Sequence, residues 1–269
     1  MIGLWWVDTV KLVGRRRWLA VPLAFALVAV MNIGGVLSCM QVSVNIWDGV
    51  LGSLGSWLFF RFIILLLFVF LTADTVLDDI MGNWAWLTLP RSSGRVKWWT
   101  VKVVSLFTAS VFYFFVGTLV LLLISSVCLP YEPTLSQFAC GQSYYSQGLP
   151  PLVFPSDANP IWLITQFVLY SAFAAGAFAL IPVTLSLVIR KSYVVALIPT
   201  AWIFLSHFWQ SNRFFFRLDL IPRLFYGVHF MSTSGSCESI TFGGSLLYIL
   251  LVICACYSIG ALVVRKADF

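Results

Sequence analysis

The stretch from 101 to 129 reads VKVVSLFTASVFYFFVGTLVLLLISSVCL and carries a single charged residue, Lys102. A helix needs roughly 20 apolar residues to cross the ~30 Å hydrocarbon layer of a bilayer, so this stretch is long enough to span a membrane. Its apolar residues are continuous and do not alternate with polar ones, which favours a helix over a strand of a membrane barrel. We therefore expect a membrane protein built from helices.

Five more apolar stretches flank this one, bounded by charged residues, Pro or Gly. The six predicted spans cover residues 18–40, 56–72, 101–129, 160–189, 192–209 and 244–264. The chain has 61% hydrophobic and 10% charged residues, whereas soluble domains carry about 25% charged residues. This composition excludes a soluble globular protein, and we expect a single all-α integral membrane domain over residues 1–269.

Most of the 16 Lys and Arg residues flank one set of span ends. If the N-terminus lies inside the cell, only Arg213, Arg217 and Arg223 are external. Because Lys and Arg are enriched in cytoplasmic loops, we expect both termini and residues 73–100 in the cytoplasm, with residues 130–159 and 210–243 outside. This distribution accounts for the net charge of +6, so we expect the bilayer, and no nucleic acid, as the partner of the basic residues.

Two segments outside the spans are predicted to form amphipathic helices. Residues 1–17 set Trp5 and Trp6 against Lys11 and three consecutive Arg residues, which favours a helix in the inner membrane interface. Residues 210–243 are too apolar for a solvated loop, and we expect two short re-entrant helices around Pro222 before the last span.

Arg61 lies within the predicted span 56–72, where an unpaired charge costs about 2.5–3.5 kcal/mol. Two roles are open for it. Arg61 could line a pathway and attract an anionic headgroup or a peptide carboxylate, or it could reach outward and pair with Asp48. In the first span, Gly34 and Gly35 are expected to let another helix approach closely.

The cysteines and histidines predict few special sites. Cys128 and Cys140 could close an external loop with a disulfide, Cys237 is a competing partner, and free thiols acting as small apolar groups are the alternative. His207 and His229 are the only histidines, and neither has Cys or carboxylate neighbours at a metal-ligand spacing. We therefore expect no metal site.

The connection after the second span carries the most information about function. Residues 73–100 read ADTVLDDIMGNWAWLTLPRSSGRVKWWT. Three Asp residues, a Gly, an apolar patch and a basic stretch predict a compact element in which Pro90 ends one helical piece. An apolar patch on a water-facing loop usually needs a partner. The alternative is that Trp84 and Trp86 rest on the membrane surface.

With this loop the chain resembles the ABC-2-type permeases, the membrane subunits of ATP-binding-cassette exporters. The resemblance covers the whole chain: a basic amphipathic start, six spans, both ends inside, a tight turn at Arg190 and Lys191, and the loop after span two. In the family that loop carries an acidic residue, Gly, apolar residues, Leu, Pro and basic residues. These positions are matched in order by Asp79, Gly82, Leu87, Leu89, Pro90, Arg91 and Lys102.

The resemblance implies roles for individual residues. A short helix in the loop would dock in a groove of the ATPase and pass its motion to the spans. The ATPase-coupling residues would be Asp78, Asp79, Gly82, Trp84, Trp86, Leu87, Leu89, Pro90 and Arg91. The re-entrant helices would close the outer end of the pathway, and the candidates for the pathway or its outer gate are Arg61, Asp48, Phe214, Phe215 and Arg217.

The chain contains no phosphate loop of the form GxxxxGK[ST], so it cannot bind and hydrolyse ATP alone by means of such a loop. A separate ATPase would have to supply the energy for transport. We therefore expect a transport subunit and not an enzyme, without a cofactor of its own, with ATP and Mg held by the ATPase. The resemblance implies two ATPase subunits, a second permease chain, either identical or a sister, and a location in the bacterial cytoplasmic membrane. The aromatic content of 17% favours an amphipathic or hydrophobic cargo, such as a peptide, an antibiotic or a lipid-like compound.

Two other functions stay open at this point. An integral-membrane hydrolase or transferase could use the cytoplasmic carboxylates of Asp74, Asp78 and Asp79 for acid and base chemistry. A membrane immunity or scaffold protein would bind a partner without transporting anything.

Overall fold

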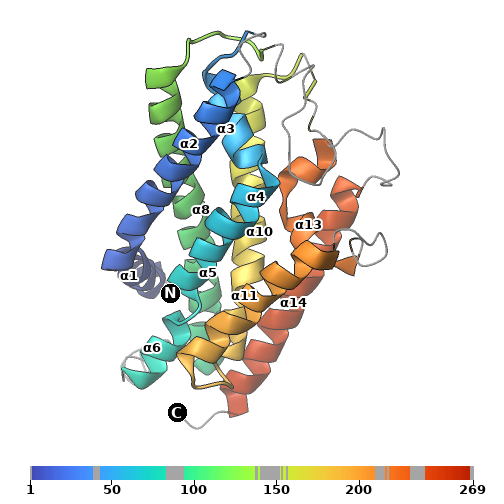
Figure 1. Cartoon of the computed structure of the whole chain (residues 1–269). Helices are drawn as coiled ribbons and strands as arrows, with labels where there is room; N and C mark the ends of the chain where they lie inside the picture. Colours follow the sequence, from blue (N-terminus) through green and yellow to red (C-terminus); the bar gives the residue numbers. More distant parts are fainter. Residues whose placement is uncertain are drawn as a thin grey trace.

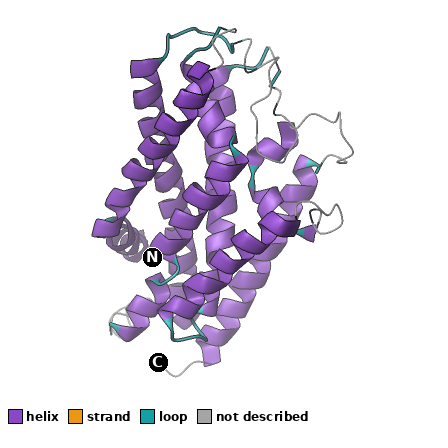
Figure 2. Cartoon of the chain, viewed as in Figure 1, coloured by secondary structure: helices purple, strands orange, loops and turns teal. Residues whose placement is uncertain are grey.

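The chain forms a bundle of helices in a computed structural model. The structure describes residues 2–38, 43–82, 94–136, 139, 152, 154–155, 157–209, 216, 218–230 and 240–266. All regular elements in these residues are helical, as Figure 2 shows. The predicted all-α fold class is therefore confirmed.

Five helical segments are long and apolar enough to cross a membrane. They run over Arg16–Gly35, Trp57–Met81, Arg95–Cys128, Pro160–Leu185 and Phe242–Lys266. They correspond to five of the six predicted spans. At the remaining predicted span, 192–209, the structure has the helix α11 (Ser192–Trp209), whose apolar part, Ser192–Phe208, is shorter than the other five.

The first elements after the N-terminus are a helix and a short linking turn. Helix α1 (Ile2–Val13) is followed by the 3-10 turn η1 (Arg16–Leu19) and then by α2 (Ala20–Ser38). The predicted N-terminal helix is thus present, and it packs on α8 (Arg95–Cys128). The Trp5 indole donates a hydrogen bond to Thr108 Oγ1 at 3.1 Å, which fixes the rotation of α1 on α8.

The second predicted span consists of several consecutive pieces. It runs through α4 (Trp57–Phe59), the π-helix η2 (Phe60–Leu65), α5 (Leu66–Thr72) and α6 (Thr75–Met81). α5 ends at the predicted residue, and the chain bends at Ala73 and Asp74 before α6 continues. The helical segment therefore extends beyond the predicted span and includes the acidic residues of α6.

Before that span lies a helix that the sequence pattern does not predict, α3 (Ile46–Gly55), every residue of which is buried. The Asn45 side chain accepts a hydrogen bond from the Trp47 backbone N–H at 3.1 Å, and Asp48 Oδ2 accepts one from the Asn45 N–H at 2.7 Å. These contacts form a capping box, which satisfies backbone donors at the start of a helix.

Helices α8 and α10 (Pro160–Leu185) stand side by side at the centre of the bundle, with α2 against α8 and α14 (Phe242–Lys266) against both (Figure 1). Glycine permits the closest approaches. A Cβ at Gly117 would lie 2.3 Å from the Phe25 ring, and one at Gly260 would lie 2.3 Å from the Trp99 ring. Among the described residues, no atom of another element lies within 4 Å of a Cβ built at Gly34 or Gly35. The close helix approach predicted for these two glycines is thus not seen in the described part of the chain.

Two short helices precede α14, as predicted. They are α13 (Leu220–Leu224), whose N-cap Asp219 accepts a hydrogen bond from the Ile221 N–H, and the 3-10 turn η3 (Tyr226–Phe230). Both pack against α10. Aromatic side chains from α10, η3 and the start of α14 surround them, with the Phe167 and Tyr226 ring centroids 4.7 Å apart.

Candidate functional site

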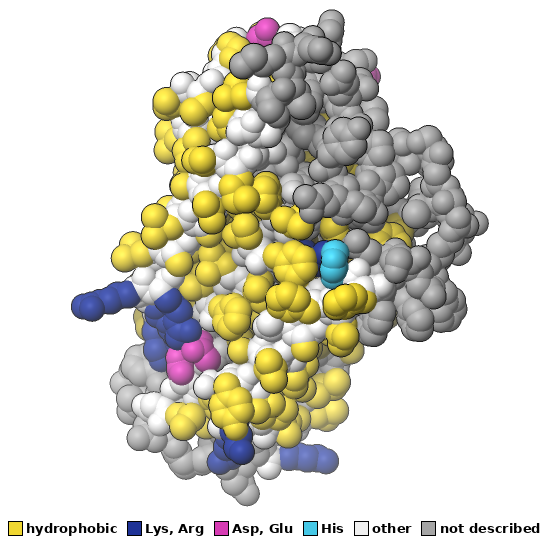
Figure 3. Space-filling model, viewed as in Figure 1, with side chains coloured by type: hydrophobic (Ala, Val, Ile, Leu, Met, Phe, Trp, Pro, Cys, Tyr) yellow, Lys and Arg dark blue, Asp and Glu magenta, His cyan; other side chains and the backbone are white. Residues whose placement is uncertain are grey.

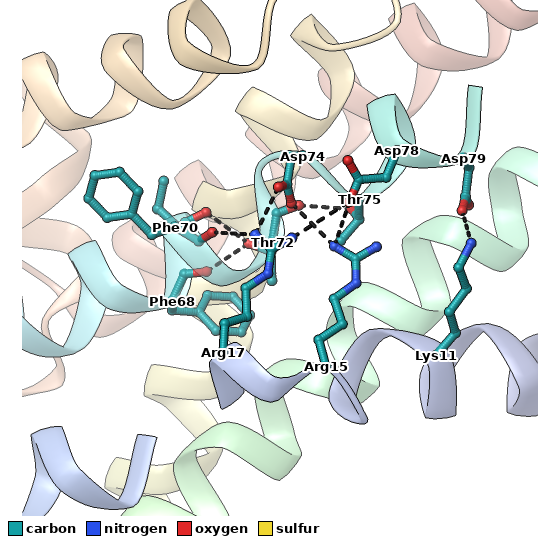
Figure 4. Close-up of polar contacts among 11 residues, drawn as sticks. Lys11, Arg15, Arg17, Phe68, Phe70, Thr72, Asp74, Thr75, Asp78 and Asp79 are labelled. Atoms are coloured by element: carbon teal, nitrogen blue, oxygen red, sulfur yellow. Dashed lines mark hydrogen bonds and ion pairs between the residues drawn. The ribbon is translucent and has the colours of Figure 1, made fainter. Parts of the chain in front are cut away.

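A cluster of ion pairs joins three helices. Figure 4 shows the part of it in which Lys11, Arg15 and Arg17 face Asp74, Asp78 and Asp79. The basic helix α1 and the turn η1 face the acidic helix α6, and α8 adds one lysine. We call this set the charge cluster, and it consists of Asp8, Lys11, Arg15, Arg17, Asp74, Asp78, Asp79 and Lys102. Four carboxylates thus face four cations, so the cluster is neutral as a whole.

The buried half of the cluster is centred on Asp79 and Lys102. Lys102 Nζ contacts the carboxylates of both Asp8 and Asp79, and Lys11 Nζ contacts the other oxygen of Asp79. Only 2% of the Asp79 side chain and 6% of the Lys102 side chain are exposed. α1, α6 and α8 therefore meet at one shared carboxylate.

The outer half of the cluster pairs arginines with aspartates at the bend before α6. Arg15 Nη1 lies 3.3 Å from Asp74 Oδ1 and 2.9 Å from Asp78 Oδ2. Arg17 lies 2.8 Å from Asp74 and 3.6 Å from Asp78, and it also donates a hydrogen bond to the Phe70 carbonyl. These pairs are half-exposed, so each contributes less than the buried pairs do.

The energetic importance of the buried half comes from desolvation. A charge removed from water and left without its partner destabilises a protein by about 3–5 kcal/mol, even though an intact buried pair adds little net stability. Loss of Asp79 would remove a carboxylate contact from Lys11 and leave Lys102 with Asp8. The cluster therefore fixes the relative positions of α1, α6 and α8 more than it raises overall stability.

Little free space remains inside the cluster. A cavity of about 20 Å³ lies between the buried residues of the cluster and the side chains of Leu106 and Val183. It has room for about one water molecule. Within the described part of the chain, no group of three or more His, Cys, Asp or Glu could hold a metal ion. The chemistry available here is electrostatic attachment of one helix to another.

The structure places Asp78 and Asp79 in the charge cluster. Asp79 is buried and paired with two lysines, and Asp78, whose side chain is 45% exposed, is paired with Arg15 and Arg17. Their contact with an ATPase stays a prediction. Gly82 follows α6 directly as its C-cap. Trp84, Trp86, Leu87, Leu89, Pro90 and Arg91 lie outside the described residues.

A second polar site surrounds Arg61, which is 1% exposed. Its guanidinium donates a hydrogen bond to His207 Nδ1 at 2.7 Å, so the ring N–H is at Nε2. The guanidinium carbon lies 4.9 Å from the Trp57 ring centroid and 4.4 Å from that of Phe62. Aromatic faces attract a cation at such distances.

The predicted pairing of Arg61 with Asp48 differs from the observed contacts. Asp48 Oδ1 accepts a hydrogen bond from the Ser136 hydroxyl at 2.7 Å, and Oδ2 caps α3. The reason is local, because Asp48 lies three residues after Asn45 and completes the capping box. Arg61 lies in the π-helix and faces α11, where His207 is the last basic residue.

The short helices before α14 form an aromatic site. His229 Nδ1 lies 3.0 Å from the Ile240 carbonyl, and the Tyr170 hydroxyl donates to the Arg223 carbonyl at 2.5 Å. Burial lowers the pKa of His229 below its ordinary value, as does the nearby charge of Arg223, against the opposing effect of the Ile240 hydrogen bond. The predicted gate residues Phe214, Phe215 and Arg217 lie outside the described residues.

Cys128 is a free, exposed thiol at the last residue of α8. The structure therefore does not contain the predicted disulfide to Cys140, which lies outside the described residues. Cys254 and Cys256 are free thiols as well.

The charge cluster includes residues that the sequence pattern did not single out as a site, namely Asp8, Lys11, Arg15 and Arg17. A signal for them exists. Asp8, Lys11 and Arg15 are spaced by three and four residues, which places them on one face of a helix, and Asp74 and Asp78 share a face in the same way. Complementary charged faces of this kind, one before the first predicted span and one after the second, indicate a contact between helices.

Searches against protein-family models, curated proteins and solved structures each found no match for this chain.

Proposed function

We propose that this chain is the membrane subunit of an exporter of the ABC-2 type, driven by ATP hydrolysis on a separate ATPase. The observation that carries the proposal is the charge cluster, in which Asp79 of α6 and Lys102 of α8 are paired. The predicted ATPase contact runs from Asp78 to Arg91, and residues 83–93 connect the end of α6 to the start of α8. A force on this connection acts on two helices that the cluster joins to each other and to α1.

The proposed coupling works as a rigid-body movement. Because α6 continues from α5 and η2, and α8 is a continuous helix of 34 residues, a shift of the connection moves long helices and not a flexible loop. Packed helices have discrete arrangements, so such a shift favours one state or another. Asp78 and Asp79 act in this scheme as anchors on the membrane side of the ATPase contact.

The pathway in this proposal is formed by six spans, with α11 as the fifth, and by a second copy or a sister chain. Its cargo is an amphipathic or hydrophobic peptide, antibiotic or lipid-like compound. Exposed apolar side chains along α14 support a surface for lipid or a second chain, among them Leu247, Leu250, Leu251, Ile259 and Leu262. α13 and η3 close the outer end, where their aromatic packing against α10 makes a compact plug.

The experiment that tests the proposal is co-purification in a mild detergent from the native host. We expect an ATPase subunit to be retained by the wild-type chain and lost when Trp84 and Trp86 are both replaced by Ala. The matched control is Trp162→Ala, which removes an indole that is 62% exposed near the start of α10, at the opposite end of the bundle from α6. Retention by the control and loss by the double variant support the proposal.

Two outcomes contradict it. A wild-type chain that purifies without any ATPase, under conditions that keep other membrane complexes together, excludes the exporter. An ATPase retained equally by the wild type and the double variant excludes residues 83–93 as the contact.

A further inference from the structure

A groove lies between the N-terminal turn and the middle of α8. It measures about 400 Å³, and it is lined by Val13, Gly14, Arg15, Arg16, Trp18, Leu19, Val21, Phe112, Tyr113 and Val116. This volume is in the range of small-molecule sites. The walls are apolar apart from two adjacent arginines, so the groove combines an apolar interior with a basic mouth.

The three consecutive arginines at this mouth differ in their contacts. Arg15 and Arg17 are paired with Asp74 and Asp78 in the charge cluster. Arg16 is exposed, and its guanidinium contacts no carboxylate among the described residues. Because the charge cluster is neutral without Arg16, it does not balance the positive charge of Arg16, and this charge lies at the mouth of the groove. Figure 3 shows basic side chains beside acidic ones on this part of the surface, next to apolar side chains.

The wall of the groove contains a buried donor without a partner. The Trp18 indole is 7% exposed and packs on the rings of Phe112 and Tyr113, whose centroids lie 6.3 Å and 6.2 Å away. Its Nε1–H has no hydrogen-bond partner within the part of the chain that the structure describes. A buried unsatisfied N–H costs about 1–3 kcal/mol, so a ligand oxygen that reached this wall would lower the free energy of the site.

The groove begins where an apolar segment long enough to span a membrane begins, because Arg16 is the first residue of the segment Arg16–Gly35. Val21 and Tyr113, at the inner wall, are 1% and 0% exposed. The outer rim is apolar and accessible, with Leu19 70% and Phe112 44% exposed. A chain lying in the bilayer can therefore enter from the side, while a charged head remains beside Arg16.

We propose that this groove binds one acidic phospholipid of the surrounding leaflet, with its phosphate on Arg16 and one acyl chain along Phe112 and Val116. Basic pockets between membrane helices recognise acidic headgroups by this combination of charge and apolar surface. The bound lipid would fill the space behind η1 and brace the turn that carries Arg15 and Arg17. This site requires only that the helices lie in a membrane and does not depend on an ATPase.

The test uses the full chain in nanodiscs, with lipid binding followed by native mass spectrometry. Phosphatidylglycerol and phosphatidylcholine with the same acyl chains are titrated in parallel, and inorganic phosphate is a third arm. We expect phosphatidylglycerol to bind more tightly than phosphatidylcholine to the wild type. Arg16→Gln should weaken phosphatidylglycerol about fivefold, because one basic residue near the surface contributes about that factor. It should weaken phosphatidylcholine less, because the choline cation already offsets the charge of that phosphate.

Two variants make the test specific. Arg190→Gln removes an exposed arginine from the turn between α10 and α11, and it should leave the preference for phosphatidylglycerol unchanged. Val116→Trp fills the groove and should weaken both lipids, with a thermal unfolding midpoint measured to show that the variant is folded.

Several results would overturn the lipid site. Equal binding of the two lipids to the wild type, or equal loss in Arg16→Gln and Arg190→Gln, removes the role of Arg16. Inorganic phosphate that binds as tightly as phosphatidylglycerol shows an anion site without a lipid. Unchanged lipid binding in folded Val116→Trp shows that the groove does not hold the acidic lipid. The same conclusion follows if a bound amphiphile is retained equally by the wild type and by Arg16→Gln.

Discussion

Asp79 contacts two ammonium groups that come from different helices, Lys11 of α1 and Lys102 of α8. Its carboxylate is almost fully buried, so these contacts replace the water that the charge has lost. The Asp79 carboxylate is therefore engaged by contacts inside the bundle.

The difference between the buried and exposed aspartates gives a prediction with an internal control. Asp79→Asn should lower stability by up to about 3–5 kcal/mol, because it removes one of the two carboxylates that contact buried Lys102. Asp78→Asn removes the same charge from a side chain that is 45% exposed and should cost about 0–1 kcal/mol. Thermal unfolding in detergent measures both, and limited proteolysis at the end of α1 reports its release. Equal destabilisation by the two variants would contradict the geometry of the charge cluster.

The sequence identifies Asp78 and Asp79 as important residues but not their partners. Lys102 lies 23 residues after Asp79, and Lys11 lies 68 residues before it, distances at which no helical spacing rule applies. Arg61 is a similar case, since its burial within a span is evident from the sequence, while His207 is 146 residues away. Contacts between helices that are distant in the chain depend on how the bundle packs, and this packing cannot be predicted from the identity of single residues.

At the level of the elements, the beginning of α10 is easy to predict. Asn159 accepts hydrogen bonds from the backbone N–H groups of Ile161 and Trp162, and Pro160 occupies the first turn, so the helix starts at the expected residue. α3 is harder, because Gly49, Gly52 and Gly55 lower the helix propensity of a ten-residue segment. The sequence signal for α3 was the capping box formed by Asn45 and Asp48. We interpreted Asp48 as an ion-pair partner of Arg61 and therefore missed its capping role.

The contact between α2 and α8 gives the prediction at this scale. Gly117→Ala would place a methyl group 2.3 Å from the Phe25 ring, and the Phe25 side chain is fully buried. We expect a loss of about 1–3 kcal/mol, as in other overpacked cores, measured by the thermal unfolding midpoint in detergent.

The matched control is Gly34→Ala on α2. No atom lies within 4 Å of its added Cβ, so this variant should be neutral or slightly stabilising. A stable Gly117→Ala protein would show that α2 and α8 are not in contact at Phe25.

For the whole molecule, the arrangement of the helix ends is consistent with both termini on one side. Arg95 at the start of α8 donates a hydrogen bond to the Arg265 carbonyl near the end of α14 at 3.2 Å, and α1 is attached to α6 and α8 by the charge cluster. Tyr131 follows the opposite end of α8. The distribution of Lys and Arg predicts the side of the membrane, whereas the structure alone reports only which ends lie together.

This orientation can be measured by labelling in intact cells. In a background in which the six native Cys residues are replaced by Ser, Tyr131→Cys should react with a membrane-impermeant maleimide. Lys191→Cys should react only after the cells are permeabilised. The reverse pattern would place residues 83–93 outside the cell, where no ATPase could reach them.

The long separation of the ion-pair partners also orders the assembly of the chain during synthesis. Lys102 is made 94 residues after Asp8, a delay of roughly 5 to 20 s at the usual rate of 5–20 residues per second. α1 is translated before α6 and α8, so the aspartates of α6 become available to Lys11 and Arg15 first, and Lys102 of α8 becomes available to Asp8 only later. The position of α1 in the bundle is thus completed only after its partners further along the chain have been made.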